Sequence, residues 1–199
     1  MARDKRRAYR DQEYWGRPVP GFGDPRACVL VLGLAPGAHG ANRTGRAFTG
    51  DSSGDWLYRA LHRAGLASQA RATRRDDGLE LRDCWISLVV RCVPPGNRPA
   101  RQEIADCERY LLREYDLLPR LRSVLALGRV AFDAALRLVA ARHGIALRPK
   151  PAFAHGAVVE LPGAPRIVAS YHPSRQNTNT GVLTEEMLDR AVALAKAFG

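Results

Sequence analysis

Four continuous apolar runs alternate with segments of helical periodicity along this chain. The runs are Ala27–Ala35, Cys84–Cys92, Ser123–Gly128 and Arg166–Tyr171. Each run predicts a strand that is buried on both faces. Continuous apolar strands alternating with helices are typical of a mostly parallel sheet that is covered by helices on both sides. The pattern therefore predicts an α/β fold, and we expect one domain over residues 1–199.

The segments between the runs predict the helices. Apolar positions over Trp56–Ala64 recur at helical spacing, and Asp51 or Ser53 is placed to cap the start. Other helices are predicted over Pro99–Leu112, over Arg129–His143 and after a capping Thr184. The stretch 156–161 is a candidate extra strand, and we expect the polar stretch 67–79 to be a solvated loop.

Unusual loops follow three of the predicted strands: Gly33–Gly54, Arg91–Pro99 and His172–Gly181. In open parallel sheets the site lies beyond the carboxyl ends of the strands, so these loops are expected to converge there. The first loop is rich in glycine. It lacks both the lysine of a P-loop and the spacing of a dinucleotide-binding turn, which argues against those two kinds of nucleotide site. No Gly-x-Ser-x-Gly nucleophile elbow is present.

Charge narrows the choice of partner. The chain has 31 Lys and Arg against 20 Asp and Glu, a net charge of +11. Such an excess favours an anionic partner, most often nucleic acid. No apolar run approaches the length of a membrane span, and the first residues lack the apolar core of a secretory signal, so we expect a cytoplasmic protein without membrane association.

The four cysteines divide into two pairs. Cys28 and Cys84 lie in strand-like runs and are expected to be core residues. Cys92 and Cys107 lie just outside such runs. A zinc or iron–sulfur site usually needs four ligands, so these two alone are a weak metal signal.

Long motifs in chain order resemble the uracil-DNA glycosylase superfamily, most closely its family 5, the type B of bacteria and archaea. The motifs are YWGRPVPGFGD (14–24), GLAPGAHGANRTGRAFTGD (33–51), VRCVPPGNRP (90–99) and SYHPSRQNTNTG (170–181). The resemblance implies a three-layer α/β/α sandwich around a four-stranded parallel sheet. It also implies hydrolysis of the N-glycosidic bond of uracil, and of other deaminated bases such as hypoxanthine, in double-stranded DNA by a monomeric enzyme.

The same resemblance implies roles for individual residues. A flipped base would meet the backbone of Gly33, Leu34, Ala35, Pro36 and Gly37 and would stack on Phe48. His172 would donate to the developing base anion, Asn97 would bind the base edge, and Asp51 would position the water or stabilise the cationic sugar. Because Ala35 stands where other families of the superfamily place a polar catalytic residue, Asp51 and His172 carry more of the catalysis. Arg175, Gln176 and Asn177 would enter the DNA groove.

Enzymes of this type carry a [4Fe–4S] cluster held by four cysteines, and Cys92 and Cys107 match the second pair. The first pair normally lies in a Cys-x-x-Cys segment just before the region matching KRRAYRDQEYWG (5–16), and no such segment follows Met1. We expect that the start was assigned too far downstream, the alternative being a form without the cluster.

Two other functions are compatible with the same residues. One is an inactive or catalytically weak DNA-binding protein of glycosylase ancestry, which would bind without releasing a base. The other is a small-molecule nucleoside or nucleotide hydrolase, which would cleave free nucleosides and show little dependence of binding on salt.

Overall fold

The computed structural model describes residue 5 and residues 7–198 of the chain. Among these residues, six strands form one sheet in the order β1-β3-β2-β4-β6-β5. The strands are β1 (Phe22–Gly23), β2 (Val29–Gly33), β3 (Cys84–Leu88), β4 (Ser123–Leu127), β5 (Val158–Val159) and β6 (Arg166–Ser170). The four central strands are parallel, and the short outer strands β1 and β5 pair antiparallel with β3 and β6.

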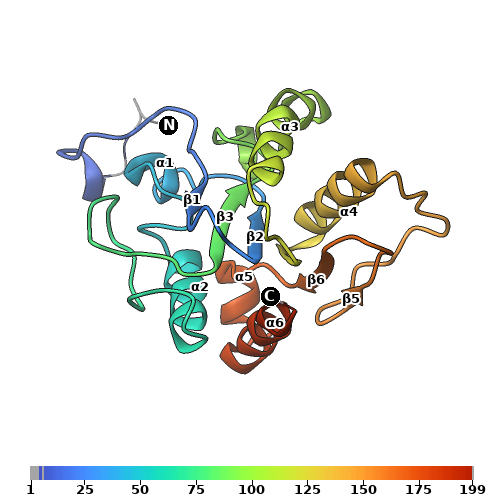
Figure 1. The fold of residues 1–199 in the computed structure, drawn as a ribbon. Coiled ribbons are helices and arrows are strands. Elements are labelled where there is room, and N and C mark those ends of the chain that lie inside the picture. The colour runs from blue at the N-terminus through green and yellow to red at the C-terminus, as the bar shows by residue number, and fades with distance from the viewer. Residues whose placement is uncertain (1–4, 6, 199) are drawn as a thin grey trace.

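Helices cover both faces of this sheet, as Figure 1 shows. The α-helices are α1 (Ala41–Thr44), α2 (Ser52–Arg63), α3 (Arg101–Asp116), α4 (Arg129–His143), α5 (Arg175–Asn179) and α6 (Glu185–Ala197). Two short 3-10 helices, η1 (Arg7–Tyr9) and η2 (Pro95–Asn97), lie in connecting segments. Within the described ranges no helix is long and apolar enough to cross a membrane.

Alternation along the buried strands separates two apolar cores. In β2, Val29 and Val31 face the cluster that contains α2 and α6, while Leu30 and Leu32 face the cluster that contains α3 and α4. Successive side chains of a strand point to opposite faces, so a fully apolar strand must be covered on both sides. The predicted three-layer α/β/α sandwich is confirmed, but the sheet has six strands where four were predicted, because the antiparallel strands β1 and β5 extend the parallel four-stranded centre.

The caps and ends of the helices follow local chemistry. Thr184 caps α6 as predicted, its hydroxyl accepting a hydrogen bond from the N–H of Met187 at 3.2 Å. Of the two candidate caps for α2, Asp51 is the one used. The helix predicted from Pro99 begins at Arg101 and continues four residues beyond Leu112. Three further elements, the strand β1 and the short helices α1 and α5 inside loops, were not predicted because each is too short to show a period.

The stretch 67–79 corrects one expectation. It is a loop, but Ala67, Ala72 and Leu79 within it are buried, and Asp77 forms an ion pair with the buried Arg46. The polar composition of the stretch predicted a solvated loop. A partner thirty-one residues earlier in the chain holds it against the fold.

Candidate active site

The three unusual loops begin at one edge of the sheet, at the carboxyl ends of the parallel strands β2, β3 and β6. Backbone hydrogen bonds fix the first turn, because the carbonyls of Gly33 and Leu34 accept from the N–H groups of Val89 and Val90 at 2.9 Å. The segment from Leu34 to Gly37 is partly exposed except for Pro36. This edge is therefore where the backbone of the first loop is open to a ligand.

Phe48 joins two of these loops. Its ring packs on Gly33 so closely that a Cβ there would lie 2.6 Å from Phe48 Cζ. Its ring centroid lies 6.0 Å from that of His172, with the planes tilted by 31°. Phe48 also has a φ of 53°, which side chains rarely adopt. The aromatic face is thus held by its surroundings in a fixed place between the first and third loops.

Asp51 lies where the first loop enters α2. One carboxylate oxygen accepts a hydrogen bond from the N–H of Gly54 at 3.0 Å and caps the helix. The other lies against Gly37 and Gly40: a Cβ on Gly37 would be 2.7 Å from Asp51 Oδ2, and one on Gly40 would overlap that atom. Burial raises the pKa of Asp51, and nearby Asp55 adds to the rise while the Gly54 N–H opposes it. Glycine at both positions leaves the space that this carboxylate occupies.

A pocket of about 250 Å³ opens beside this carboxylate. Its lining residues are Tyr9, His39, Gly40, Gly50, Asp51, Ser52, Ser53, Ser174 and Arg175. Arg175 closes it from α5, since its Nε donates to Ser52 Oγ at 3.1 Å. The pocket therefore combines the first and third loops with the start of α2.

His172 begins the third loop. Burial lowers its pKa to about 4, so the imidazole is neutral at neutral pH and retains one ring N–H donor. Asn177 fixes the loop by donating from Nδ2 to the carbonyl of His172 at 2.8 Å. Arg175 and Gln176 are exposed in the same short helix α5. One turn therefore places a neutral histidine against Phe48 and exposed polar residues a few positions later.

Asn97 occupies a different position. It ends η2 in the second loop, is exposed, and has a φ of 57°. Among the described residues, those that line the pocket beside Asp51 do not include it.

The two cysteines outside the strands lie near each other. Cys92 is exposed after β3, and Cys107 is half-buried on α3. Burial raises the pKa of the Cys92 thiol, and the nearby Cys107 and Glu103 add to this rise. Cys28 and Cys84 are buried in the core, as predicted. In the described part of the chain no three His, Cys, Asp or Glu residues gather as a metal-binding group, so these residues do not complete a four-thiolate site.

Sequence reasoning missed a histidine that lines the pocket and an arginine that holds the loop around it. His39 Nδ1 hydrogen-bonds Tyr14 Oη at 2.8 Å and its ring stacks on Tyr9. Arg43 donates to the carbonyls of His39 at 2.8 Å and Gly50 at 3.2 Å, which ties the two sides of the first loop together. Only the i, i+4 spacing of His39, just before α1, and Arg43, within α1, could have indicated a local pair.

The fold and the site together define an α/β/α protein whose aromatic-lined pocket is built from loops at the carboxyl edge of a parallel sheet. A family model of the uracil DNA glycosylase superfamily matches residues 20–196. Type-5 uracil-DNA glycosylase of Thermus thermophilus is 50% identical over 96% of this chain and 85% of its own length. Those of Mycobacterium bovis and Pyrobaculum aerophilum are 51% and 46% identical over 96% of this chain, and over 70% and 80% of their own lengths. The chain belongs to the uracil DNA glycosylase superfamily, in its type-5 family.

Proposed function

We propose that this chain is a DNA-repair glycosylase that hydrolyses the N-glycosidic bond of uracil in DNA. One observation carries the proposal: Phe48 and Asp51 of the first loop and His172 of the third loop lie at the same edge of the sheet, in a chain about half identical to type-5 uracil-DNA glycosylases. We extend the proposal to other deaminated bases such as hypoxanthine, and to a monomeric, cytoplasmic enzyme.

Base recognition is the first step. A base paired within a duplex is out of reach, so it must be flipped into a pocket. Phe48 offers the stacking face, and the backbone of residues 33–37 offers groups for the edge of the base. Stacking of a base on an aromatic ring contributes about 1–3 kcal/mol. Asn97, on the exposed second loop, would complete the contact with the base edge once DNA is bound.

Bond cleavage leaves the electron pair of the C1′–N1 bond on the base and positive charge on the sugar. His172, neutral at neutral pH, donates a hydrogen bond to the base oxygen where negative charge develops. Asp51 stabilises the cationic sugar and orients a water molecule. The water oxygen bonds to C1′, and its proton passes to the Asp51 carboxylate and then to the departed base.

DNA itself is held by the exposed end of the third loop. Arg175, Gln176 and Asn177 lie in α5, and Arg175 lines the pocket and donates to Ser52 beside Asp51. Phosphate contacts fix the register of DNA on the protein, and amide side chains suit base edges. We propose a double-stranded substrate on this ground.

We further propose that Cys92 and Cys107 are the part of a [4Fe–4S] ligand set that this sequence provides. Their mutual approach after β3 and on α3 supports this role, although the described residues do not complete the set. Such a cluster would tie the second loop to α3. Iron per chain, compared between the native protein and Cys92→Ser, tests it: equal iron content contradicts the role.

Uracil release from a duplex that carries one U·G pair tests the proposed activity. Alkali treatment after incubation converts each abasic site into a strand break. Cleavage by the native chain and its loss in Asp51→Asn would support the proposal. DNA binding without cleavage would favour an inactive DNA-binding protein. Cleavage of free nucleosides with little salt dependence of binding would favour a small-molecule hydrolase.

A further inference from the structure

A second basic surface lies beside the pocket. We call residues 71–77 the arginine loop, because Arg71, Arg74 and Arg75 in it are exposed. The loop joins the pocket rim directly: the N–H of Gly50, the residue before Asp51, donates to the carbonyl of Ala72 at 3.0 Å.

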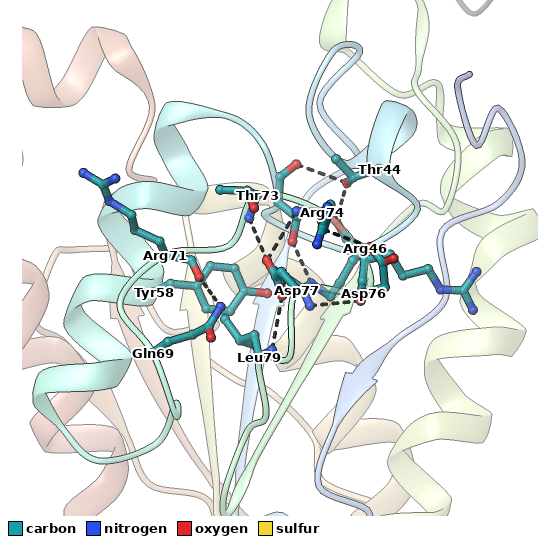
Figure 2. A network of polar contacts seen from close by, with 12 residues as sticks. Thr44, Arg46, Tyr58, Gln69, Arg71, Thr73, Arg74, Asp76, Asp77 and Leu79 are labelled. Atoms are coloured by element: carbon teal, nitrogen blue, oxygen red, sulfur yellow. Dashed lines mark hydrogen bonds and ion pairs between the residues drawn. The ribbon is translucent and has the colours of Figure 1, made fainter. Parts of the chain in front are cut away.

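One buried carboxylate shapes the arginine loop, and Figure 2 shows it at the centre of the network. Asp77 accepts hydrogen bonds from the backbone N–H groups of Thr73 at 2.8 Å and Leu79 at 3.2 Å. Both of its oxygens also lie 2.8 Å from Arg46 Nη2. Burial alone would raise the pKa of Asp77, but the hydrogen bonds from Thr73 and Arg46 hold it below its ordinary value.

Arg46 anchors the arginine loop to the first site loop. Its exposed fraction is 2%, and it donates to Thr49 Oγ1 at 3.0 Å and to the carbonyl of Arg75 at 3.2 Å. A buried ion pair is weak evidence for stability, because desolvation of both charges offsets their attraction. Its clear structural effect here is that it fixes the arginine loop against the segment that carries Phe48.

The three arginine side chains are left on the surface. Arg75 lies 4.5 Å from the centroid of the Trp15 ring, which Arg17 also approaches at 5.7 Å. Arg74 pairs with Asp76 at 3.3 Å, but both side chains are more than 70% exposed, so this pair contributes little. Arg71 extends away from the network (Figure 2).

Acidic groups near this surface are few. Asp76 is exposed on the arginine loop, and Glu13 shares a hollow with Trp15, Arg17 and Arg43. Asp77 is neutralised by Arg46. The surface around the arginine loop is therefore positive and faces solvent.

The place of this surface next to the pocket indicates which partner it binds. Gly50 bonds to Ala72 of the arginine loop, and Ser52, two residues later, accepts from Arg175 of α5. Gly50, Asp51 and Ser52 line the pocket, so both the arginine loop and Arg175 adjoin it. A nucleotide flipped into it remains linked to phosphates on both sides, and duplex DNA carries one charge per about 1.7 Å of its axis.

We propose that the arginine loop binds the phosphate backbone of DNA next to the flipped nucleotide, as a contact separate from that of α5. This inference rests on the proposed function and adds a surface that the motifs of the three site loops do not include. The interaction is electrostatic, so it acts on any DNA sequence and weakens as salt rises.

Salt-dependent binding to an undamaged duplex tests this surface. Arg71→Ala/Arg74→Ala/Arg75→Ala should bind about tenfold or more weakly at low salt. The slope of the logarithm of the binding constant against the logarithm of salt concentration is negative. Its magnitude should decrease by about 1 for each phosphate that the variant no longer neutralises. Uracil release from the U·G duplex at saturating enzyme should keep the native rate. A slope equal to that of the native chain would overturn the proposal.

Two variant sets separate charge from structure. Arg82→Ala/Arg120→Ala/Arg122→Ala removes the same charge from exposed positions at the amino ends of β3 and β4, away from the pocket, and should leave the slope near the native value. Replacing the three loop arginines by lysine keeps their charge and should therefore keep most of the native salt dependence of binding. If the distant variant lowered the slope by the same amount, the arginine loop would act only through the net charge of the protein. That result would overturn the proposal.

A single change guards against misfolding of the triple variant. Arg71→Ala leaves the Asp77 network intact and should lower the slope by about 1 if this side chain meets a phosphate. If the native chain releases no uracil, the proposed activity fails. In that case the slope comparison still tests whether the arginine loop binds DNA, because it measures binding and not uracil release.

Discussion

The Asp51 carboxylate accepts the N–H of Gly54 at 3.0 Å, so the proposed catalytic group is also the N-cap of α2. Its second oxygen lies against Gly37 and Gly40 in the pocket loop. The helix cap therefore aims the carboxylate at the site. Loss of the side chain would disturb both helix and pocket, and a variant must separate the two effects.

Asp51→Asn separates them, because asparagine caps helices about as well as aspartate. We expect its melting temperature to stay near the native value. Single-turnover uracil release should slow by about 10²–10⁴-fold, the usual size of an acid–base contribution. Asp51→Ala should reduce both the rate and the stability. Equal release rates in Asp51→Asn and the native chain would exclude the catalytic role.

His172 should make stability depend on pH. Its pKa of about 4 in the folded protein lies below the ordinary 6.5, so the unfolded chain binds more protons between these values. The free energy of unfolding should fall as pH drops from about 6.5 to about 4. Urea unfolding at pH 7 and pH 5 should show a smaller fall in His172→Asn than in the native chain. The same dependence in both would contradict the low pKa.

The same variant tests the hydrogen bond to the base. His172→Asn should slow uracil release by about 10²–10³-fold, the size expected when a donor to a developing anion is removed. The measurement is single-turnover release at pH 7, where the imidazole is neutral. An unchanged rate would leave the backbone groups of residues 33–37 as the whole anion site.

Gly33→Ala should displace Phe48, because a Cβ at Gly33 would lie 2.6 Å from the ring. Loss of about 1–3 kcal/mol of stacking should raise the concentration of uracil-containing duplex that half-saturates the protein by roughly 5- to 150-fold. In a Phe48→Ala background the Gly33→Ala change should have little further effect, since the ring it displaces is absent. Additive effects in the double variant would show that Gly33 acts independently of Phe48.

Asp77→Asn should destabilise the fold by about 3 kcal/mol, because it leaves the charge of Arg46 buried without its partner. The two side chains are only 3% and 9% exposed. Asp76→Asn, next to it but 83% exposed, is the matched control and should change stability by less than about 0.5 kcal/mol. Equal unfolding midpoints in urea for the two variants would contradict the importance of the buried pair.

Much of the fold could be predicted from local pattern. The apolar runs that became β2, β3, β4 and β6 are long enough to show burial on both faces, and helix caps such as Thr184 are local chemistry. The stretch 156–161, a candidate extra strand, contains β5, whereas the two-residue strand β1 was not predicted because it carries too few residues for a period. The motifs placed Asp51, Phe48 and His172 on loops at the carboxyl edge, and their contacts there are consistent with that expectation.

The sequence by itself determined the order of strands and helices, the excess of positive charge, and the loops that carry polar residues, since each depends on neighbours along the chain. Only the tertiary structure decided that Asp51 fits against Gly37 and Gly40, that His172 is neutral, and that Asp77 holds the arginine loop to Arg46. These properties arise from burial and from contacts between distant residues. Space, dielectric environment and distant partners are set only when the layers pack.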